Sequence, residues 1–415
     1  MDRRIFLKSS GLALVSYGVL PKFLVRAAYA EGEAARRKKA LVVVFQRGAC
    51  DGLNTVIPYA DPLYRSLRPT IAVPAPRGDD KSALDLDGHF GLHPALEPLL
   101  PLWREGSLAA VHAIGSPDAT RSHFDAQDFM ESGTPGRKST DDGWMNRALL
   151  AQPDPKATPF RAVSLTPTLP RSLQGKASAV ALTDLRGFDL RKGAGPAVTR
   201  GFEEMYAGAV DTVLHGAGRD TFDAVDFLKK ANPGQQAPAA GATYPRGRYG
   251  DALRQIAQLL KSDVGVELAF AEIGGWDTHA AEGGAEGQLA QRHRELGGAL
   301  AAFHKDMGDR MSDVVVLTLT EFGRTVRENG NRGTDHGHAG VSFVMGGPVR
   351  GGTLHGRWPG LAQDQLYEGR DLAMTTDFRD LLGEILTRHM GVRDLRAVFP
   401  GHELKETRYP GVLRG

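Results

Sequence analysis

The sequence predicts an α/β protein with a doubly wound, mostly parallel sheet and helices on both faces. Five short apolar runs are typical of strands buried on both sides, at residues 40–46, 108–114, 265–273, 314–320 and 341–345. Helical patterns occur at residues 94–104, 123–131, 199–214, 249–261, 287–307 and 378–390. Because buried strands alternate with helices, we expect one sheet covered on both faces.

The segments between these elements indicate the domain organisation. Residues 232–250 are rich in Pro, Gly, Ala and Gln without periodicity, which predicts an exposed connection. Residues 140–231 carry weaker strand signals, and we expect an inserted cap over the sheet within about 140–248. Residues 31–415 as a whole are expected to form a single α/β domain.

The first thirty residues contain the three parts of a secretory signal. A basic start reads RRIFLK at residues 3–8, an apolar stretch covers residues 11–20, and an A-x-A cleavage site ends at residue 30. The apolar stretch is about half the length that spans a bilayer, so we expect no stable membrane span. The paired arginines predict the twin-arginine translocation machinery as a partner and a periplasmic or secreted location.

Composition excludes one class of partner and one kind of covalent support. Without residues 1–30 the chain carries 46 Lys and Arg against 48 Asp and Glu. A nucleic-acid-binding protein would carry a clustered basic surface, so we expect no nucleic-acid partner. Cys50 is the only cysteine, which excludes an intramolecular disulfide, and we interpret it as a small buried hydrophobic residue.

Acidic and histidine residues recur directly after the predicted strands. They are Asp51, Asp277, His279 and Glu321, followed by Asp335, His336 and His338 in the loop TDHGH. In an open α/β sheet, sites collect at the carboxyl ends of strands. Mixed carboxylate and imidazole ligands suit zinc, manganese or iron, and we expect one or two divalent ions, zinc or manganese foremost. Any single member of this set is otherwise a capping or surface residue.

Ser122 stands just before the helical pattern at 123–131. It is in position to cap that helix, with Asp125 at the third helical position. Alternatively, a hydroxyl at a helix N-terminus is a candidate nucleophile beside free backbone N–H groups. Arg121 and Arg324, and similarly Arg47, are candidates to clamp an anion, or else they pair with surface carboxylates.

Five motifs follow the signal in order: RGACDGLNTVIP, RSHFDAQDFMESG, GGWDTH, TEFGRT and TDHGHAG. In this combination the chain resembles the domain-of-unknown-function 1501 family over nearly all of residues 31–415. That family is distantly similar to the alkaline phosphatase and sulfatase superfamily. The resemblance implies an alkaline-phosphatase-like fold that carries a two-metal site.

The resemblance also implies roles for single residues. Asp51 matches the first metal-binding aspartate of the superfamily, and Ser122 falls where the Ser or Thr nucleophile stands. Asp277 and His279 resemble the Asp and His pair on one metal.

The last strand departs from the superfamily pattern, which ends in Asp-His-Gly. Here the strand ends in Glu-Phe-Gly at 321–323, and an Asp-His-Gly-His sequence comes only at 335–338. Either Glu321 replaces the aspartate while His336 or His338 supplies the imidazole, or the loop itself is the displaced motif. In either case one of the two metals could be lost.

Two functions are consistent with these features. The first is an exported metal-dependent hydrolase or transferase that acts on a phosphate or sulfate ester of a small molecule or polymer, with Ser122 as nucleophile. The second is a non-catalytic periplasmic or envelope protein that retains the fold for binding or assembly.

Overall fold

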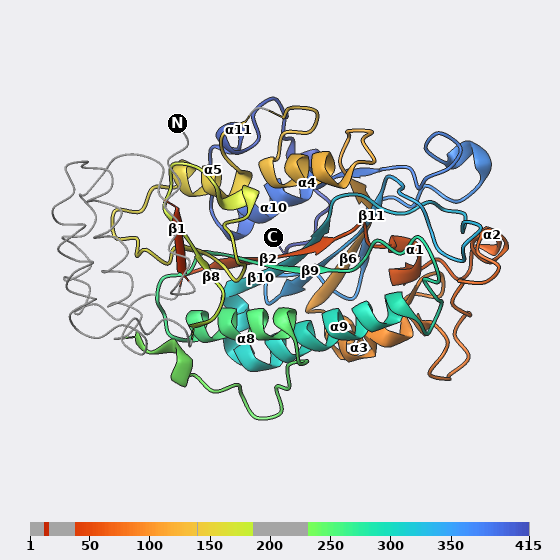
Figure 1. The fold of residues 1–415 in the computed structure, drawn as a ribbon, viewed down its shortest axis with the longest axis horizontal. Helices are drawn as coiled ribbons and strands as arrows, with labels where there is room; N and C mark the ends of the chain where they lie inside the picture. The colour runs from red at the N-terminus through yellow and green to blue at the C-terminus, as the bar shows by residue number, and fades with distance from the viewer. Residues whose placement is uncertain (1–11, 16–37, 139, 186–230, 415) are drawn as a thin grey trace.

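A computed structural model describes residues 12–15, 38–138, 140–185 and 231–414 (Figure 1). Within these ranges ten strands form one mixed, mostly parallel sheet in the order β1-β8-β7-β9-β2-β10-β11-β6-β12, with β13 also paired to β6. The strands are β1 (Leu12–Val15), β2 (Ala40–Arg47), β6 (Leu108–Gly115), β7 (Ala162–Ser164), β8 (Ala179–Leu182), β9 (Leu268–Gly274), β10 (Val314–Thr320), β11 (Gly340–Gly346), β12 (Leu354–His355) and β13 (Thr376–Asp377). The predicted α/β sheet is confirmed at this level.

Strand β2 lies at the centre and forms parallel ladders with β9 and β10. Its side chains alternate between the two faces, because successive residues of a strand point to opposite sides. Val42 and Val44 belong to one buried apolar cluster, and Leu41, Val43 and Phe45 belong to the other. The strand therefore reads as a continuous apolar run.

Helices cover both faces of the sheet (Figure 1). One face is covered by α3 (Leu100–Arg104), α8 (Arg248–Lys261) and α9 (Gln288–Met307), and the other by α4 (His123–Ser132), α5 (Trp144–Ala151), α10 (Phe378–Glu384) and α11 (Leu395–Val398). Two short helices, α1 (Gly52–Thr55) and α2 (Pro62–Leu67), follow β2, and a small antiparallel sheet is made of β3 (Val56–Ile57), β4 (Leu84–Asp85) and β5 (Gly91–Leu92).

Strand β11 runs antiparallel to both of its neighbours, β10 and β6. Its amino end therefore lies at the edge where β2, β9, β10 and β6 have their carboxyl ends. The loop that enters β11 carries residues 335–338, so topology returns these residues to the same edge as the ends of the parallel strands.

Two predicted helices are less regular than expected. Residues 94–104 begin as a 3₁₀ helix, Pro94–Leu99, and only then continue as α3. Pro98 and Pro101 lack the N–H groups that an α-helix needs at those positions. Helix α10 similarly ends in a π-helical turn, Ile385–His389.

The first described part of the expected cap, residues 140–185, contributes two strands to the main sheet. Within 140–185, β7 and β8 extend the sheet and α5 packs against α11. The predicted helix at 199–214 lies outside the described residues, as does the expected signal apart from Leu12–Val15, which pair with β8. Among the described helices, none combines the length and apolar character needed to cross a bilayer.

Candidate metal centre

Three side chains from distant parts of the sequence converge at the edge described above. His123 is the first residue of α4, Asp277 follows β9, and His336 lies in the loop before β11. One ligand atom from each lies within 4.8 Å of the others. His123 Nε2 is 3.4 Å from Asp277 Oδ2, and His336 Nε2 is 3.2 Å from Asp277 Oδ1. The group has the mixed imidazole and carboxylate composition that transition metals and zinc prefer.

His279 adjoins this group. Its Nε2 lies 3.0 Å from Asp277 Oδ1 and 2.9 Å from His336 Nε2. Of the predicted ligands, Asp277, His279 and His336 are thus brought together.

The three imidazoles are all oriented through Nδ1. Each Nδ1 lies beside an acceptor oxygen: His123 is 2.8 Å from Glu321 Oε1, His336 is 2.8 Å from the Arg121 carbonyl, and His279 is 3.0 Å from Asp335 Oδ1. A carbonyl has no proton to give, so His336 must donate through Nδ1. With Nδ1 protonated, the Nε2 of a neutral ring carries a lone pair and faces Asp277. This is the arrangement found around metal ions, where the outer ring nitrogen donates to an oxygen.

The protein supplies too few hydrogen-bond donors to satisfy the lone pairs of these Nε2 atoms. The buried Nε2 of His123 makes no hydrogen bond within the described residues. If His279 and His336 both donate through Nδ1, their neutral Nε2 atoms place two lone pairs 2.9 Å apart. Either an added proton or a cation is needed to relieve this repulsion. The residues present therefore fit a divalent cation.

Phe322 supports two of the imidazoles. Its ring centroid lies 5.0 Å from that of His123 and 5.1 Å from that of His336, and its side chain is buried. These contacts give the phenylalanine of the Glu-Phe-Gly sequence after β10 a packing role. Phe322 packs against imidazoles that come from α4 and from the loop before β11.

Glu321 contacts His123 and lies outside the converging group. It is fully buried, and its Oε1 also accepts from Gly48 N and Gln127 Nε2, each at 2.8 Å. Burial alone would raise the pKa of Glu321, but hydrogen bonds from His123 and Gln127 outweigh it and lower the pKa. The hydrogen bond to Glu321, opposed by burial, raises the pKa of His123. Glu321 is therefore a carboxylate that orients His123.

Arg324 is buried and bound to Asp277. Its Nη1 lies 2.7 Å from Asp277 Oδ1, and its Nε donates to Thr334 Oγ1 at 3.0 Å. Burial would raise the pKa of Asp277, whereas the hydrogen bond and charge of Arg324 outweigh burial and lower the pKa. Asp277 is therefore ionised, and Arg324 forms an ion pair with it.

Asp51 forms a separate buried ion pair at the end of β2. The guanidinium of Arg68 binds both carboxylate oxygens of Asp51, and it also donates to the carbonyls of Thr325 and Val326. Burial would raise the pKa of Asp51, but Arg68 outweighs this and lowers it. Glu282 lies beside this pair, where burial and then the charge of Asp51 raise its pKa well above the usual value. Asp51 therefore already has a cationic partner.

The remaining loop residues have other contacts. His338 is buried and stacks on Tyr367 with ring centroids 4.2 Å apart, and it lies outside the converging group. Asp335 holds His279, as described above, and also accepts from Asn329 Nδ2 at 3.0 Å. Of the loop residues, His336 therefore belongs to the group and Asp335 orients a neighbour.

Ser122 caps α4 as expected, because its Oγ accepts from the Asp125 N–H at a long 3.5 Å. Arg121 binds two carboxylates, Glu368 at 2.6 Å and Asp371 at 2.7 Å. Arg47 likewise pairs with Glu272 at 2.6 Å and Glu131 at 2.9 Å. All three candidate arginines, Arg121, Arg47 and Arg324, are thus ion-paired.

Cys50 is a free, buried thiol whose pKa is raised by burial, consistent with a small core residue.

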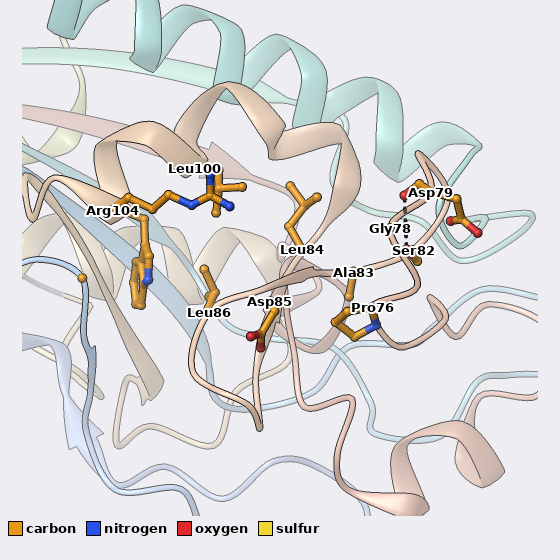
Figure 2. Close-up of a pocket in the computed structure, with 12 residues that line it drawn as sticks. Pro76, Gly78, Asp79, Ser82, Ala83, Leu84, Asp85, Leu86, Leu100 and Arg104 are labelled. Atoms are coloured by element: carbon orange, nitrogen blue, oxygen red, sulfur yellow. Dashed lines mark hydrogen bonds between the residues drawn. The ribbon is translucent and has the colours of Figure 1, made fainter.

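A pocket lies elsewhere, between the 76–86 loop and α3 (Figure 2). Its volume is about 620 Å³, and Leu84, Leu86, Leu100 and Arg104 are among the residues that line it. No residue of the converging group lines this pocket.

His123 is the one member of the group that the sequence prediction missed. It directly follows Ser122 within the motif RSHFDAQDFMESG, at the start of a helix after a predicted strand. His123 lies eight residues after the end of β6. It therefore carries the same signal as the other candidates, a histidine that follows a buried strand.

Comparison with known proteins identifies a family without an assigned activity. Residues 103–407 match the model of the family described as "Protein of unknown function (DUF1501)". No curated protein matches the chain. Because the match covers well over half of the chain, the protein belongs to the DUF1501 family.

Proposed function

We propose that the protein is a metal-dependent hydrolase or transferase that acts on a phosphate or sulfate ester. His123, Asp277 and His336 would hold one divalent cation, zinc or manganese, with His279 beside it. The observation that carries the proposal is the orientation of three imidazoles through Nδ1, with each Nε2 directed at Asp277. A bound cation would supply a Lewis acid for an ester oxygen and activate a nucleophile.

We favour one cation at this site. In the superfamily resemblance, Asp51 would be a ligand of a metal pair in an alkaline-phosphatase-like fold. Here the Arg68 guanidinium lies against both oxygens of Asp51, and a second cation there would face a buried positive charge. The pairing of Asp51 with Arg68 therefore supports a site with a single metal ion in place of the expected pair.

Two routes of attack are open to such a site. Ser122 would attack as a nucleophile, or water would attack without a covalent intermediate. The Oγ of Ser122 accepts only a long hydrogen bond from the Asp125 N–H, so its capping role constrains it weakly. The Ser122→Ala variant separates the routes: nucleophilic attack by Ser122 predicts loss of at least about a thousandfold in kcat, and attack by water predicts retained activity.

The non-catalytic alternative has one specific observation in its favour. Arg121, Arg324 and Arg47 are each bound to carboxylates, so none of them is free to clamp an anionic ester. A binding or assembly role in the periplasm or envelope would need no such clamp. Both functions place the protein outside the cytoplasm, after export by the twin-arginine machinery.

Turnover by the metal-loaded full chain distinguishes the two functions. Phenyl phosphate, a phosphodiester and phenyl sulfate are offered to protein that contains zinc or manganese, and to the same protein after chelation. Hydrolysis that needs the metal and disappears in Asp277→Ala supports the proposal. Metal-loaded protein that hydrolyses none of these esters would favour the binding role.

A further inference from the structure

A buried aspartate outside the converging group is linked to His336 by two arginines. Asp371 is fully buried and lies in the loop before β13. Its Oδ2 accepts from Arg121 Nη2 at 2.7 Å, and its Oδ1 accepts from Arg370 Nε at 2.9 Å. A buried carboxylate needs such partners, because an unpaired charge loses its hydration at a large cost in free energy.

Both arginines contact His336, each through a different group. The backbone carbonyl of Arg121 accepts from His336 Nδ1 at 2.8 Å, in the ring orientation that places Nε2 3.2 Å from Asp277 Oδ1. The guanidinium of Arg370 donates through Nη2 to the carbonyl of His336. Asp371 therefore binds both the residue that orients the imidazole and the residue that binds its backbone.

The backbone of the loop before β11 does not by itself determine this ring orientation. A hydrogen bond from Thr325 N to Asp335 O places the loop beside the segment after β10. The acceptor for the imidazole belongs to another element, because Arg121 lies two residues before α4. Asp371 joins the two elements, through Arg121 on one side and Arg370 on the other.

Asp371 is the stronger of the two carboxylate partners of Arg121. The side chain of Glu368 is 54% exposed, whereas that of Asp371 is fully buried. Exposed ion pairs contribute little free energy, since water and salt screen both charges. Asp371 also binds the second arginine that contacts His336.

We propose that Asp371 is a positioning residue, which holds the His336 imidazole in its metal-binding orientation through Arg121 and Arg370. The proposal rests on the proposed metal centre and adds a residue that lies outside the converging group. Outer groups of this kind set the orientation of metal-ligating imidazoles. If Asp371 served only the stability of its own loop, its loss would lower the unfolding free energy and leave the His336 ring unchanged.

The tautomer of His336 tests the proposal in the metal-free full chain. At about pH 8, above the usual pKa of histidine, a neutral ring carries its proton on one nitrogen. Nitrogen-15 NMR of histidine-labelled wild type should show His336 protonated at Nδ1, and His336→Gln assigns the signal by removing it. Asp371→Asn should show a mixture of both tautomers, because the Arg121 carbonyl is no longer held against the ring.

Zinc affinity gives a second readout. Asp371→Asn should bind zinc about tenfold more weakly than wild type in competition with a chelator, the lower end of the loss expected for groups behind a metal ligand. The amide keeps the size of the side chain but loses the charge, and its NH₂ group cannot accept from an arginine. The variant should still fold, because Arg121 retains Glu368 and Arg370 is partly exposed.

Asp380→Asn is the matched control. It neutralises another buried aspartate, which lies on α10, pairs with His402 at 2.8 Å and is outside the converging group. Its unfolding free energy should fall, whereas the His336 tautomer and the zinc affinity should stay as in wild type.

Three results would overturn the proposal: mixed tautomers in wild type, an unchanged tautomer or zinc affinity in Asp371→Asn, or an equal change of the tautomer in Asp380→Asn. Failure of the metal centre itself has a different signature. If wild type binds no zinc and Asp371→Asn alone alters the tautomer, the metal centre is rejected and the link from Asp371 to His336 is retained. If wild type binds zinc and Asp371→Asn alters neither readout, the metal centre is retained and the positioning role is rejected.

Discussion

Single residues set the state of the site through hydrogen bonds behind the imidazoles. Glu321 is the clearest case, because its carboxylate is fully buried and accepts from His123 Nδ1 at 2.8 Å. A carboxylate in this position fixes the ring and makes Nε2 a better ligand. Glu321 is therefore a positioning residue for His123.

The Glu321→Gln variant should bind the metal about 10- to 100-fold more weakly than wild type. The amide lacks the negative charge that stabilises a protonated Nδ1, and its NH₂ group cannot accept from the donors that surround the carboxylate, which include Gly48 N and Gln127 Nε2. Competition with a chelator of known affinity measures the change. Glu368→Gln, which alters an exposed partner of Arg121, is the matched control and should bind as wild type. Equal affinities in the two variants would reject the positioning role.

Glu282 is a second residue with an unusual state. It is fully buried beside Asp51, and its Oε2 accepts from Thr278 Oγ1 at 3.0 Å and Thr334 Oγ1 at 2.7 Å. Burial, and then the charge of Asp51, raise its pKa well above the usual value. The folded chain therefore binds a proton here that the unfolded chain releases.

This proton gives stability a defined dependence on pH. Because the folded pKa is raised, the stabilisation is complete below the unfolded pKa of about 4.5 and is lost as pH rises toward the folded value. The Glu282→Gln variant mimics the neutral acid, so its unfolding free energy relative to wild type should rise between pH 5 and pH 8. Urea unfolding in the presence of a chelator measures this difference. Glu286→Gln, an exposed partner of Lys81, should show no such trend, and a flat difference for Glu282→Gln would contradict the assignment.

At the scale of elements, a buried arginine ties together two loops at the functional edge. Arg68 follows α2 and binds Asp51 after β2, and it donates to two carbonyls in the segment after β10. Such a pair contributes little net stability when intact, yet removal of one partner leaves a buried charge without compensation.

Arg68→Met should therefore lower the unfolding free energy by about 3–5 kcal/mol. Arg77→Met removes an arginine that is 57% exposed and pairs with Asp79, and it should cost less than about 1 kcal/mol. Denaturant unfolding of both variants gives the comparison. A loss below about 1 kcal/mol for Arg68→Met would mean that Asp51 is not held as an ion.

The elements themselves were largely predictable from local pattern. The run ALVVVFQ became β2 because a strand covered on both faces needs apolar residues at every position. The direction of β11 was not predictable, since a short apolar run pairs equally well in either direction. That direction decides where His336 lies.

The site was predictable only in part. Asp277, His279 and His336 followed from residue type and position after strands. The partner of Asp51 did not, because Arg68 reaches it through the fold and carries no local signal. His123 was predictable as a ligand from its position after a buried strand, but in the same motif Ser122 was interpreted as a nucleophile and His123 was not considered.

At the scale of the whole molecule, the candidate centre links three segments far apart in the chain. His123, Asp277 and His336 come from α4, from the loop after β9 and from the loop before β11. An ion bound by all three would favour the folded state, because the unfolded chain cannot hold these residues together.

Metal should therefore stabilise the protein by mass action. At a free concentration a hundredfold above its Kd, one bound ion raises the unfolding free energy by about 2.7 kcal/mol. Thermal unfolding with zinc or manganese, compared with magnesium as a poor match for imidazole ligands, tests this. Equal shifts with all three ions, or a shift that persists in Asp277→Ala, would argue against the site.

The metal content of His123→Ala tests the central claim most directly. Elemental analysis of the purified full chain should find about one zinc or manganese ion per wild-type molecule and less than about a tenth of an ion in His123→Ala. His338→Ala, which removes a buried imidazole outside the group, should keep its metal. Full occupancy in His123→Ala, or loss of metal in His338→Ala alone, would contradict a centre built from His123, Asp277 and His336.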